Sequence, residues 1–133
     1  MKFFIDENMP PHLAEGLAIL EKPNNDGVEV YSIQKEFGRG VQDEEWIPKV
    51  GSVNGIVITQ DYNIQRTQQQ YELLRKYKMG IFYLRPPGKK LGYKYWEMVQ
   101  KIINHWEEIK ELGKGKFPFA YRIMPKGKIE KLN

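Results

Sequence analysis

Hydrophobic positions along the chain fall into short apolar runs separated by amphipathic segments. The first run, residues 3–5, is Phe-Phe-Ile, and an unbroken apolar run is typical of a strand buried on both faces. Residues 28–33, 55–59 and 79–84 are similar runs rich in β-branched and aromatic side chains. We therefore predict four strands, most of them buried on both faces.

Between these runs, apolar residues recur at the spacing of an α-helix. This pattern predicts helices at residues 10–21 and 65–76, and a long amphipathic helix that ends near residue 112. Residues 119–132 read as a short hairpin. Strand, helix and strand joined by short returns favour parallel pairing, so we predict an α/β fold. It has three layers (α/β/α), a mostly parallel four- to five-stranded sheet with the order 2-1-3-4, and a short C-terminal β hairpin.

Two of the predicted strands end in an aspartate. Asp6 follows the first strand and Asp61 follows the third. In the predicted order these strands are neighbours at the point where the chain switches direction across the sheet, which is where α/β proteins bind ligands. We expect Asp6 and Asp61 to face one crevice, although an isolated Asp after a strand often only caps the next helix.

A third acidic group, Asp43-Glu44-Glu45, precedes Trp46. Acids in this position are typical of a helix start, where they suit the free amides and the positive end of the helix dipole. Helix capping is therefore the structural interpretation of these three side chains. Because Pro48 is unfavourable inside a helix, we expect a short helix or one that begins near Glu45.

Composition and charge narrow the class of protein. A length of 133 residues predicts one domain, residues 1–133, and the absence of cysteine excludes disulfides and thiolate zinc sites. Before Arg85 the chain has 9 basic and 12 acidic residues, and from Arg85 onward it has 12 basic and 5 acidic residues, including the helix and tail from about residue 93. A basic flank beside an acidic site suits a polyanion, although lysines also simply keep small proteins soluble. With no apolar stretch near the length of a membrane span, we expect a soluble cytoplasmic protein with no membrane partner.

Converging carboxylates repel one another unless a cation lies between them. Hard oxygen ligands of this kind suit Mg²⁺ or Mn²⁺. Such ions activate water and stabilise the transition state of phosphate esters. Hydrolysis of phosphodiester bonds is the reaction for which an acidic site and a basic flank make joint sense.

Three motifs in fixed order strongly resemble the PIN-like nucleases, particularly a small VapC-type group. They are Phe-Ile-Asp-Glu-Asn-Met-Pro at residues 4–10, Gly-Val-Gln-Asp-Glu-Glu-Trp at residues 40–46 and Val-Ile-Thr-Gln-Asp at residues 57–61. The closing residues 119–123, with Gly127, also resemble the tail of that group. The resemblance therefore covers nearly the whole chain.

The resemblance implies a metal-dependent ribonuclease that is often the toxin of a toxin-antitoxin pair. It implies Mg²⁺ or Mn²⁺ as cofactor, RNA as substrate, and a cognate antitoxin protein and a second copy of the chain as partners. The ligands it implies are Asp6, Asp61 and the acid at the helix start, which is Asp43 or, if the helix phase differs by one residue, Glu44.

Other polar residues flank these acids. Arg39 and Arg66 lie just beyond two of the acidic motifs, where they can contact phosphate or act as ordinary surface residues. We expect four further residues around the ligands, with Asn8 either capping the first helix or orienting a water: Glu7, Asn8, Thr59 and Asn63.

Asn63 departs from the family pattern, because many relatives carry a further acid at this position. Because of this departure, a second interpretation is a PIN-like module that binds RNA or a partner without cutting. A receiver domain of phosphorelay signalling is the third interpretation, with Asp61 as the phosphoacceptor. It requires a hydroxyl residue after the fourth strand and a Lys after a fifth parallel strand, whereas the fourth strand here runs into Arg85.

Overall fold

The computed structural model describes residues 1–60, 64–88 and 93–132, and the side chains of residues 64–66 lie outside this description. The strands are β1 (Lys2–Ile5), β2 (Glu29–Ser32), β3 (Ile56–Gln60), β4 (Gly80–Leu84), β5 (Phe119–Ile123) and β6 (Ile129–Leu132). The helices are α1 (Pro11–Glu21), η1 (Lys22–Asn24, a 3-10 helix), α2 (Ile33–Phe37), α3 (Asp43–Gly51), α4 (Ile64–Lys76) and α5 (Tyr95–Leu112).

All of these strands belong to one sheet with the order β2-β1-β3-β4-β5-β6. Neighbours from β2 to β5 pair in parallel, and only β6 is antiparallel to its neighbour. The predicted order 2-1-3-4, the mostly parallel sheet and the C-terminal hairpin are confirmed. The sheet is wider than predicted because both hairpin strands join it.

The direction in which the chain adds strands to the sheet reverses at β1, because β2 lies on one side of β1 and the later strands lie on the other. Phe3 pairs with Val30 of β2 on one side and with Ile56 of β3 on the other. The carboxyl ends of β1 and β3 therefore lie side by side at the switch point, which is the position that binds ligands in open α/β sheets.

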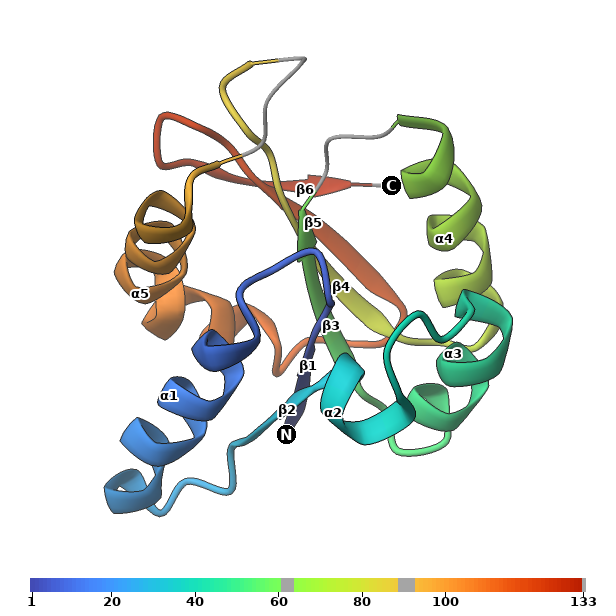
Figure 1. Ribbon diagram of the computed structural model, residues 1–133, viewed down its shortest axis with the longest axis horizontal. Coiled ribbons are helices and arrows are strands. Elements are labelled where there is room, and N and C mark those ends of the chain that lie inside the picture. The colour runs from blue at the N-terminus through green and yellow to red at the C-terminus, as the bar shows by residue number, and fades with distance from the viewer. Residues whose placement is uncertain (61–63, 89–92, 133) are drawn as a thin grey trace.

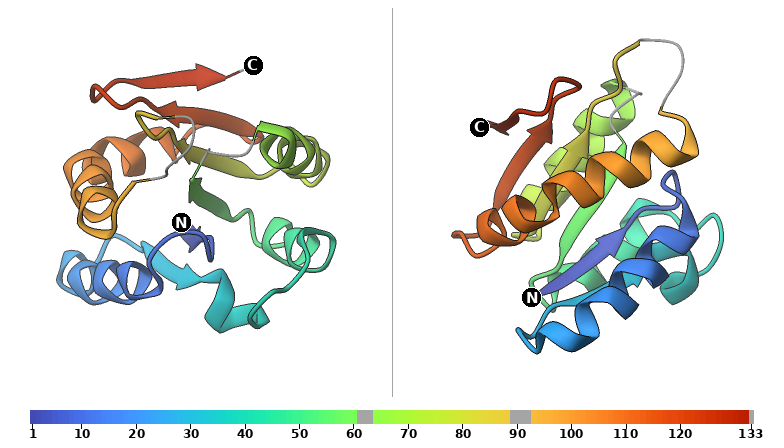
Figure 2. Two further views of the ribbon diagram at one scale, coloured as in Figure 1. Left: turned by 45° about the horizontal axis from the view of Figure 1, so that its top comes forward. Right: turned by 90° about the vertical axis from the view of Figure 1, so that its left-hand side faces the viewer.

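Helices cover both faces of the sheet, as Figures 1 and 2 show. Helices α1 and α5 lie on one face, and α2, α3 and α4 lie on the other. Alternate residues of each strand enter the two cores: Phe3 and Ile5 pack under α1 and α5, whereas Phe4 packs with Trp46 of α3. Burial of each large apolar side chain contributes on the order of 1.5–3 kcal/mol, which explains why the central strands are mostly apolar.

Two helices differ from the sequence predictions. Helix α2 was not predicted, and it begins where the Ser32 hydroxyl accepts the backbone N–H of Lys35 at 3.3 Å. Helix α3 begins at Asp43 and continues through Pro48 to Gly51. Of the two expectations, the short helix is therefore confirmed, at 9 residues, and the start near Glu45 is wrong. Pro48 has no backbone N–H, so the helix lacks one hydrogen bond there. The burial of Trp46, Ile47 and Val50 nevertheless holds the helix on the sheet.

A buried ionic group joins α1 to α5. The Glu21 carboxylate accepts hydrogen bonds from Lys110 Nζ at 2.9 Å and from Trp106 Nε1 at 2.6 Å. The Glu21 side chain is 4% exposed and the Lys110 side chain is 8% exposed. This contact fixes the end of α1 against the last turns of α5.

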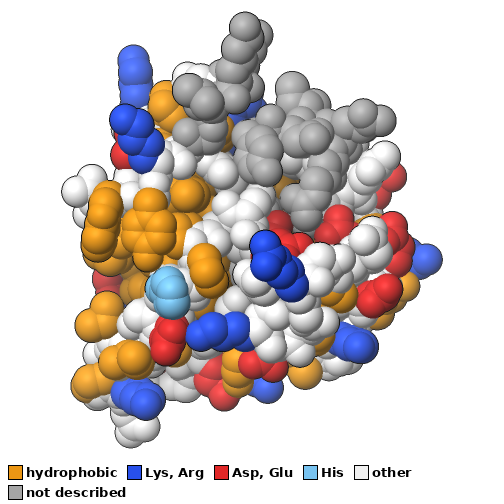
Figure 3. Space-filling model, viewed as in Figure 1, with side chains coloured by type: hydrophobic (Ala, Val, Ile, Leu, Met, Phe, Trp, Pro, Cys, Tyr) orange, Lys and Arg blue, Asp and Glu red, His pale blue; other side chains and the backbone are white. Residues whose placement is uncertain are grey.

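The outer surface of these two helices is unusually apolar. Figure 3 shows hydrophobic side chains gathered over α1 and α5, and the large exposed ones in these helices are Ile19, Leu20, Tyr95, Trp96 and Ile103. Across the part of the chain that the structure describes, no helix has the length and apolar content to cross a membrane.

Candidate active site

Asp6 occupies the carboxyl end of β1, where it is only 2% exposed. Its backbone N–H donates to the Ile58 carbonyl at 2.9 Å, so the residue remains fixed to β3. Its carboxylate oxygens accept hydrogen bonds on both sides: Oδ1 from the Glu7 N–H at 2.8 Å and Oδ2 from the Thr59 hydroxyl at 2.7 Å. These bonds set the orientation of a buried carboxylate at the switch point of the sheet.

Asn8 lies between β1 and α1 and forms hydrogen bonds with the end of β3. Its amide nitrogen donates to the Gln60 carbonyl at 3.1 Å, and its Oδ1 accepts the Gln60 N–H at 3.2 Å. The Thr59 hydroxyl lies 3.2 Å from the same oxygen. Asn8 does not cap α1, because the N-cap is Pro10 and has no side-chain cap bond. It instead mimics a strand residue and holds Asp6 beside β3.

The Gln60 side chain extends this network toward α5. It is 8% exposed, and its Oε1 accepts the Tyr93 N–H at 2.7 Å. Sequence reasoning missed both residues. Gln60 stood inside the Thr-Gln-Asp motif and could have been singled out, whereas nothing in the local pattern marked Tyr93.

Glu7 faces solvent, as expected for the residue after Asp6. Its carboxylate Oε2 accepts the Gly40 N–H at 3.1 Å. Gly40 has a φ of +73°, a conformation that favours glycine. Glu7 therefore ties the β1–α1 connection to the loop that leads into α3, and exposed Arg39 lies in that loop.

Asp43 is the first residue of α3 and is half-buried. Its Oδ1 accepts the Trp46 Nε1–H at 3.1 Å, while Glu44 and Glu45 are exposed. The N-cap residue is Gln42, which makes no side-chain cap bond. All three acids nevertheless lie in the first turn of α3, where they favour the helix through its dipole.

Three of the predicted site residues fall outside the part of the chain that the structure describes. Asp61 and Asn63 lie outside the described residues, as does the side chain of Arg66. Within residues 1–60, 64–88 and 93–132, no three His, Asp or Glu side chains form a group that could hold a metal ion. The described part thus provides buried Asp6 and its polar supports at the carboxyl edge, with Asp43 at the start of a neighbouring helix.

The structure defines an α/β protein with a carboxylate site. A buried aspartate lies at the switch point of the parallel sheet, and helix α3 begins with acidic residues. A family model described as "PIN like domain" matches residues 1–86. The chain therefore belongs to the PIN-like family, whose members are generally nucleases. The match spans β1 to β4, including Asp6, Asp43, Thr59 and Asp61. No curated protein and no solved structure matches the chain.

The structure contains one feature that a receiver domain requires. Strand β5 is a fifth parallel strand, and Lys126 follows its end. Strand β4, however, ends at Leu84 and continues into Arg85 and Pro86, with no hydroxyl residue in the position that a receiver uses. The family match agrees with the PIN-like interpretation.

Proposed function

We propose that the protein is a metal-dependent ribonuclease that hydrolyses phosphodiester bonds in RNA. The observation that carries this proposal is the buried carboxylate of Asp6, held by Thr59 at the switch point of a PIN-like fold.

The donor chemistry fits Mg²⁺ or Mn²⁺, because the polar groups at this edge are oxygen ligands and the chain has no cysteine. We assign Asp6, Asp43 and Asp61 as the residues that hold the ion, with Glu44 as the substitute for Asp43. A bound ion would lower the pKa of a water molecule and stabilise negative charge on the phosphate.

The remaining residues position these ligands and the substrate. Thr59 and the Glu7 N–H orient the Asp6 carboxylate, while Asn8 keeps the β1–α1 connection against β3. The Glu7 carboxylate holds the loop before α3. Arg39 and Arg66 are proposed to contact the phosphates of RNA, and Asn63 to orient polar groups around the ligands.

The biological setting that we propose is a toxin-antitoxin pair in the cytoplasm. The resemblance of the three ordered motifs to the VapC-type group supports this setting. A cognate antitoxin protein would cover the acidic crevice, and a second copy of the chain would form a homodimer.

The four aspartates of the chain allow a matched test. Purified wild type, Asp6→Asn, Asp43→Asn and Asp61→Asn are incubated with a mixed RNA pool in Mn²⁺, in Mg²⁺ and in EDTA. Asp26→Asn is the control, because Asp26 is exposed in the α1–β2 connection. We expect metal-dependent cutting by wild type and the control, with a loss of at least 100-fold in the Asp6 and Asp61 variants. Equal activity in all five proteins, or none with any metal, contradicts the proposal.

A non-catalytic module that binds RNA or a protein partner is the second candidate function. Asn63 favours it, because an amide supplies no charge where many relatives carry an acid. Tight RNA binding without cutting in either metal would select this alternative. Phosphorylation of Asp61 by a small phosphodonor would instead select the receiver interpretation.

A further inference from the structure

An open hollow of about 550 Å³ lies between α5 and the β5–β6 turn. Its lining includes Tyr93, Gln100, Lys101, Asn104, His105 and Lys126. Pro87, which follows β4, and Pro125, which follows β5, complete its rim. Because β4 and β5 are parallel to β1 and β3, this rim lies at the edge of the sheet that carries Asp6.

A chain of hydrogen bonds links the hollow to the acidic site. Tyr93 lines the hollow and donates its N–H to Gln60, and Gln60 is held in turn by Asn8. Asn8 shares the Thr59 hydroxyl with Asp6. Tyr93 is thereby held to the carboxyl end of β3, next to the strand that leads to Asp6.

The charges of the hollow favour an anion. Lys101 and Lys126 are its cations, and Lys101 is held by a hydrogen bond to the Pro125 carbonyl. The acid in its lining, Glu97, accepts the Lys94 N–H at 2.9 Å as part of the start of α5. His105 adds an imidazole that pairs with Glu108 at 3.8 Å.

Tyr93 supplies a buried hydroxyl that no described residue satisfies. Its hydroxyl oxygen is buried, and within the described residues no hydrogen-bond partner reaches it. Burial, and to a smaller extent Glu97, raises the pKa of this phenol, so it stays a neutral donor at physiological pH.

We propose that this hollow binds one nucleotide of a single-stranded RNA whose neighbouring phosphodiester lies at the acidic site. Lys101 and Lys126 contact phosphate, and the amides of Gln100 and Asn104 contact the base edge or the 2′-hydroxyl. The size is within the roughly 300–1,000 Å³ typical of small-molecule sites. An unpaired base can enter such a hollow, whereas a base inside a duplex cannot. The inference rests on the proposed function, because it assumes that RNA is the substrate.

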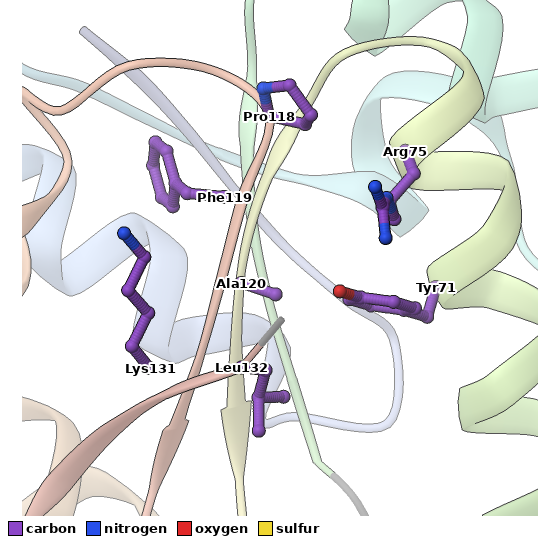
Figure 4. A pocket seen from close by; sticks show the side chains of 7 residues that line it. All are labelled: Tyr71, Arg75, Pro118, Phe119, Ala120, Lys131 and Leu132. Atoms are coloured by element: carbon purple, nitrogen blue, oxygen red, sulfur yellow. The ribbon is translucent and has the colours of Figure 1, made fainter.

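A second hollow of about 200 Å³ lies on the opposite face of the sheet, between α4 and the C-terminal hairpin. Figure 4 shows Tyr71 and Arg75 of α4 facing Ala120 and Leu132, with Lys131 beyond them. Phe119 pairs with Gly80 at the start of β4, so this hollow lies toward the edge where the strands begin. It is away from Asp6 and is not on the path of the RNA.

The two histidines of the chain provide a direct test. His105 lines the hollow, whereas His12 lies on α1 with its side chain 75% exposed. Imidazole resonances are followed by NMR while a single-stranded RNA octamer is added in EDTA, which prevents metal-dependent cutting. We expect saturable shifts of the His105 signals and unchanged His12 signals. RNA binding that leaves His105 unmoved overturns the proposal, as does the absence of any RNA binding.

Lys126→Ala and Lys116→Ala form a matched pair of variants. Lys126 is exposed in the β5–β6 turn, and Lys116 is exposed in the α5–β5 connection, outside the lining of the hollow. We expect a 3- to 10-fold loss of affinity in Lys126→Ala, with a salt slope smaller by about 0.7, as for one lost phosphate contact. Equal affinity and slope in the two variants overturn the proposal.

Cleavage assays separate this inference from the proposed function. If His105 shifts and Lys126→Ala weakens binding while wild type cuts no RNA, the nuclease proposal fails and the nucleotide site stands. If wild type cuts RNA and His105 never shifts, the nuclease stands and the nucleotide site fails.

Discussion

The Thr59 hydroxyl donates a hydrogen bond of 2.7 Å to Oδ2 of Asp6, across the junction between β3 and β1. Both residues are almost completely buried, at 1% and 2% exposure. A hydrogen bond to an ionised group is stronger than one between neutral groups. Thr59 therefore fixes the orientation of the Asp6 carboxylate at the carboxyl edge of the sheet.

Thr59→Val should weaken RNA cleavage by about 10- to 100-fold, the range found when a residue that orients a metal ligand is removed. Valine keeps the shape of threonine but cannot donate to Asp6. Cleavage rate against Mn²⁺ concentration is the measurement, with unfolding by urea as a check that the variant folds. Thr59→Ser keeps the hydroxyl and should retain most activity. Equal activity in Thr59→Val and wild type would show that the Thr59 hydroxyl does not orient Asp6.

The sequence predicts the sheet well because β1 and β3 are buried on both faces, and their apolar runs follow directly from that burial. Because the two strands pair in parallel, their carboxyl ends lie at one edge of the sheet. Helix α2 was missed because five residues are too few for a clear helical period. The contacts of Glu7 with Gly40 and of Gln60 with Tyr93 each join residues 33 positions apart, so only the folded chain brings them together.

Glu7→Ala should loosen the loop that leads into α3. Its carboxylate accepts the Gly40 N–H on the protein surface. We expect faster hydrogen exchange of the Gly40 amide and about a 10-fold decrease in cleavage, because Asp43 follows this loop. Glu36→Ala, an exposed acid in α2, is the control. Unchanged exchange at Gly40 would mean that the contact contributes nothing to the order of the loop.

Two glycines should respond in opposite ways to replacement by alanine. At Gly55 an added Cβ would lie 2.3 Å from Val50 Cγ1 and 2.9 Å from Phe4 Cε2, so Gly55→Ala should destabilise the fold by about 1–3 kcal/mol. At Gly16, inside α1, nothing lies within 4 Å of that position. Gly16→Ala should stabilise the protein by roughly 0.5–1 kcal/mol, because alanine is the better helix former. Urea unfolding of both variants measures these changes in the free energy of unfolding. A loss of stability in Gly16→Ala would contradict the prediction for Gly16.

The buried pair of Glu21 and Lys110 should make the protein sensitive to acid. Burial alone would raise the pKa of Glu21, but hydrogen bonds from Lys110, Trp106 and Asn24 outweigh it and hold that pKa below its usual value of 4.5. The folded state therefore favours the ionised carboxylate, and this contribution to stability is present at neutral pH and lost as the pH falls through the lowered pKa. Burial alone would likewise lower the pKa of Lys110, yet its bonds to Glu21 and Glu107 raise it, so the ammonium keeps its charge throughout this range.

Lys110→Met should cost about 3–5 kcal/mol at neutral pH, because it leaves the Glu21 carboxylate buried without its cation. The double variant Glu21→Gln with Lys110→Met should recover part of this loss, since neither charge is then buried. Lys114→Met is the control, because Lys114 pairs with Glu111 on the surface, where such pairs contribute about 0–1 kcal/mol. Urea unfolding at about pH 7 and about pH 3 measures all four proteins. A double variant no more stable than Lys110→Met, or a wild type equally stable at both pH values, would show that the pair does not stabilise the contact between α1 and α5.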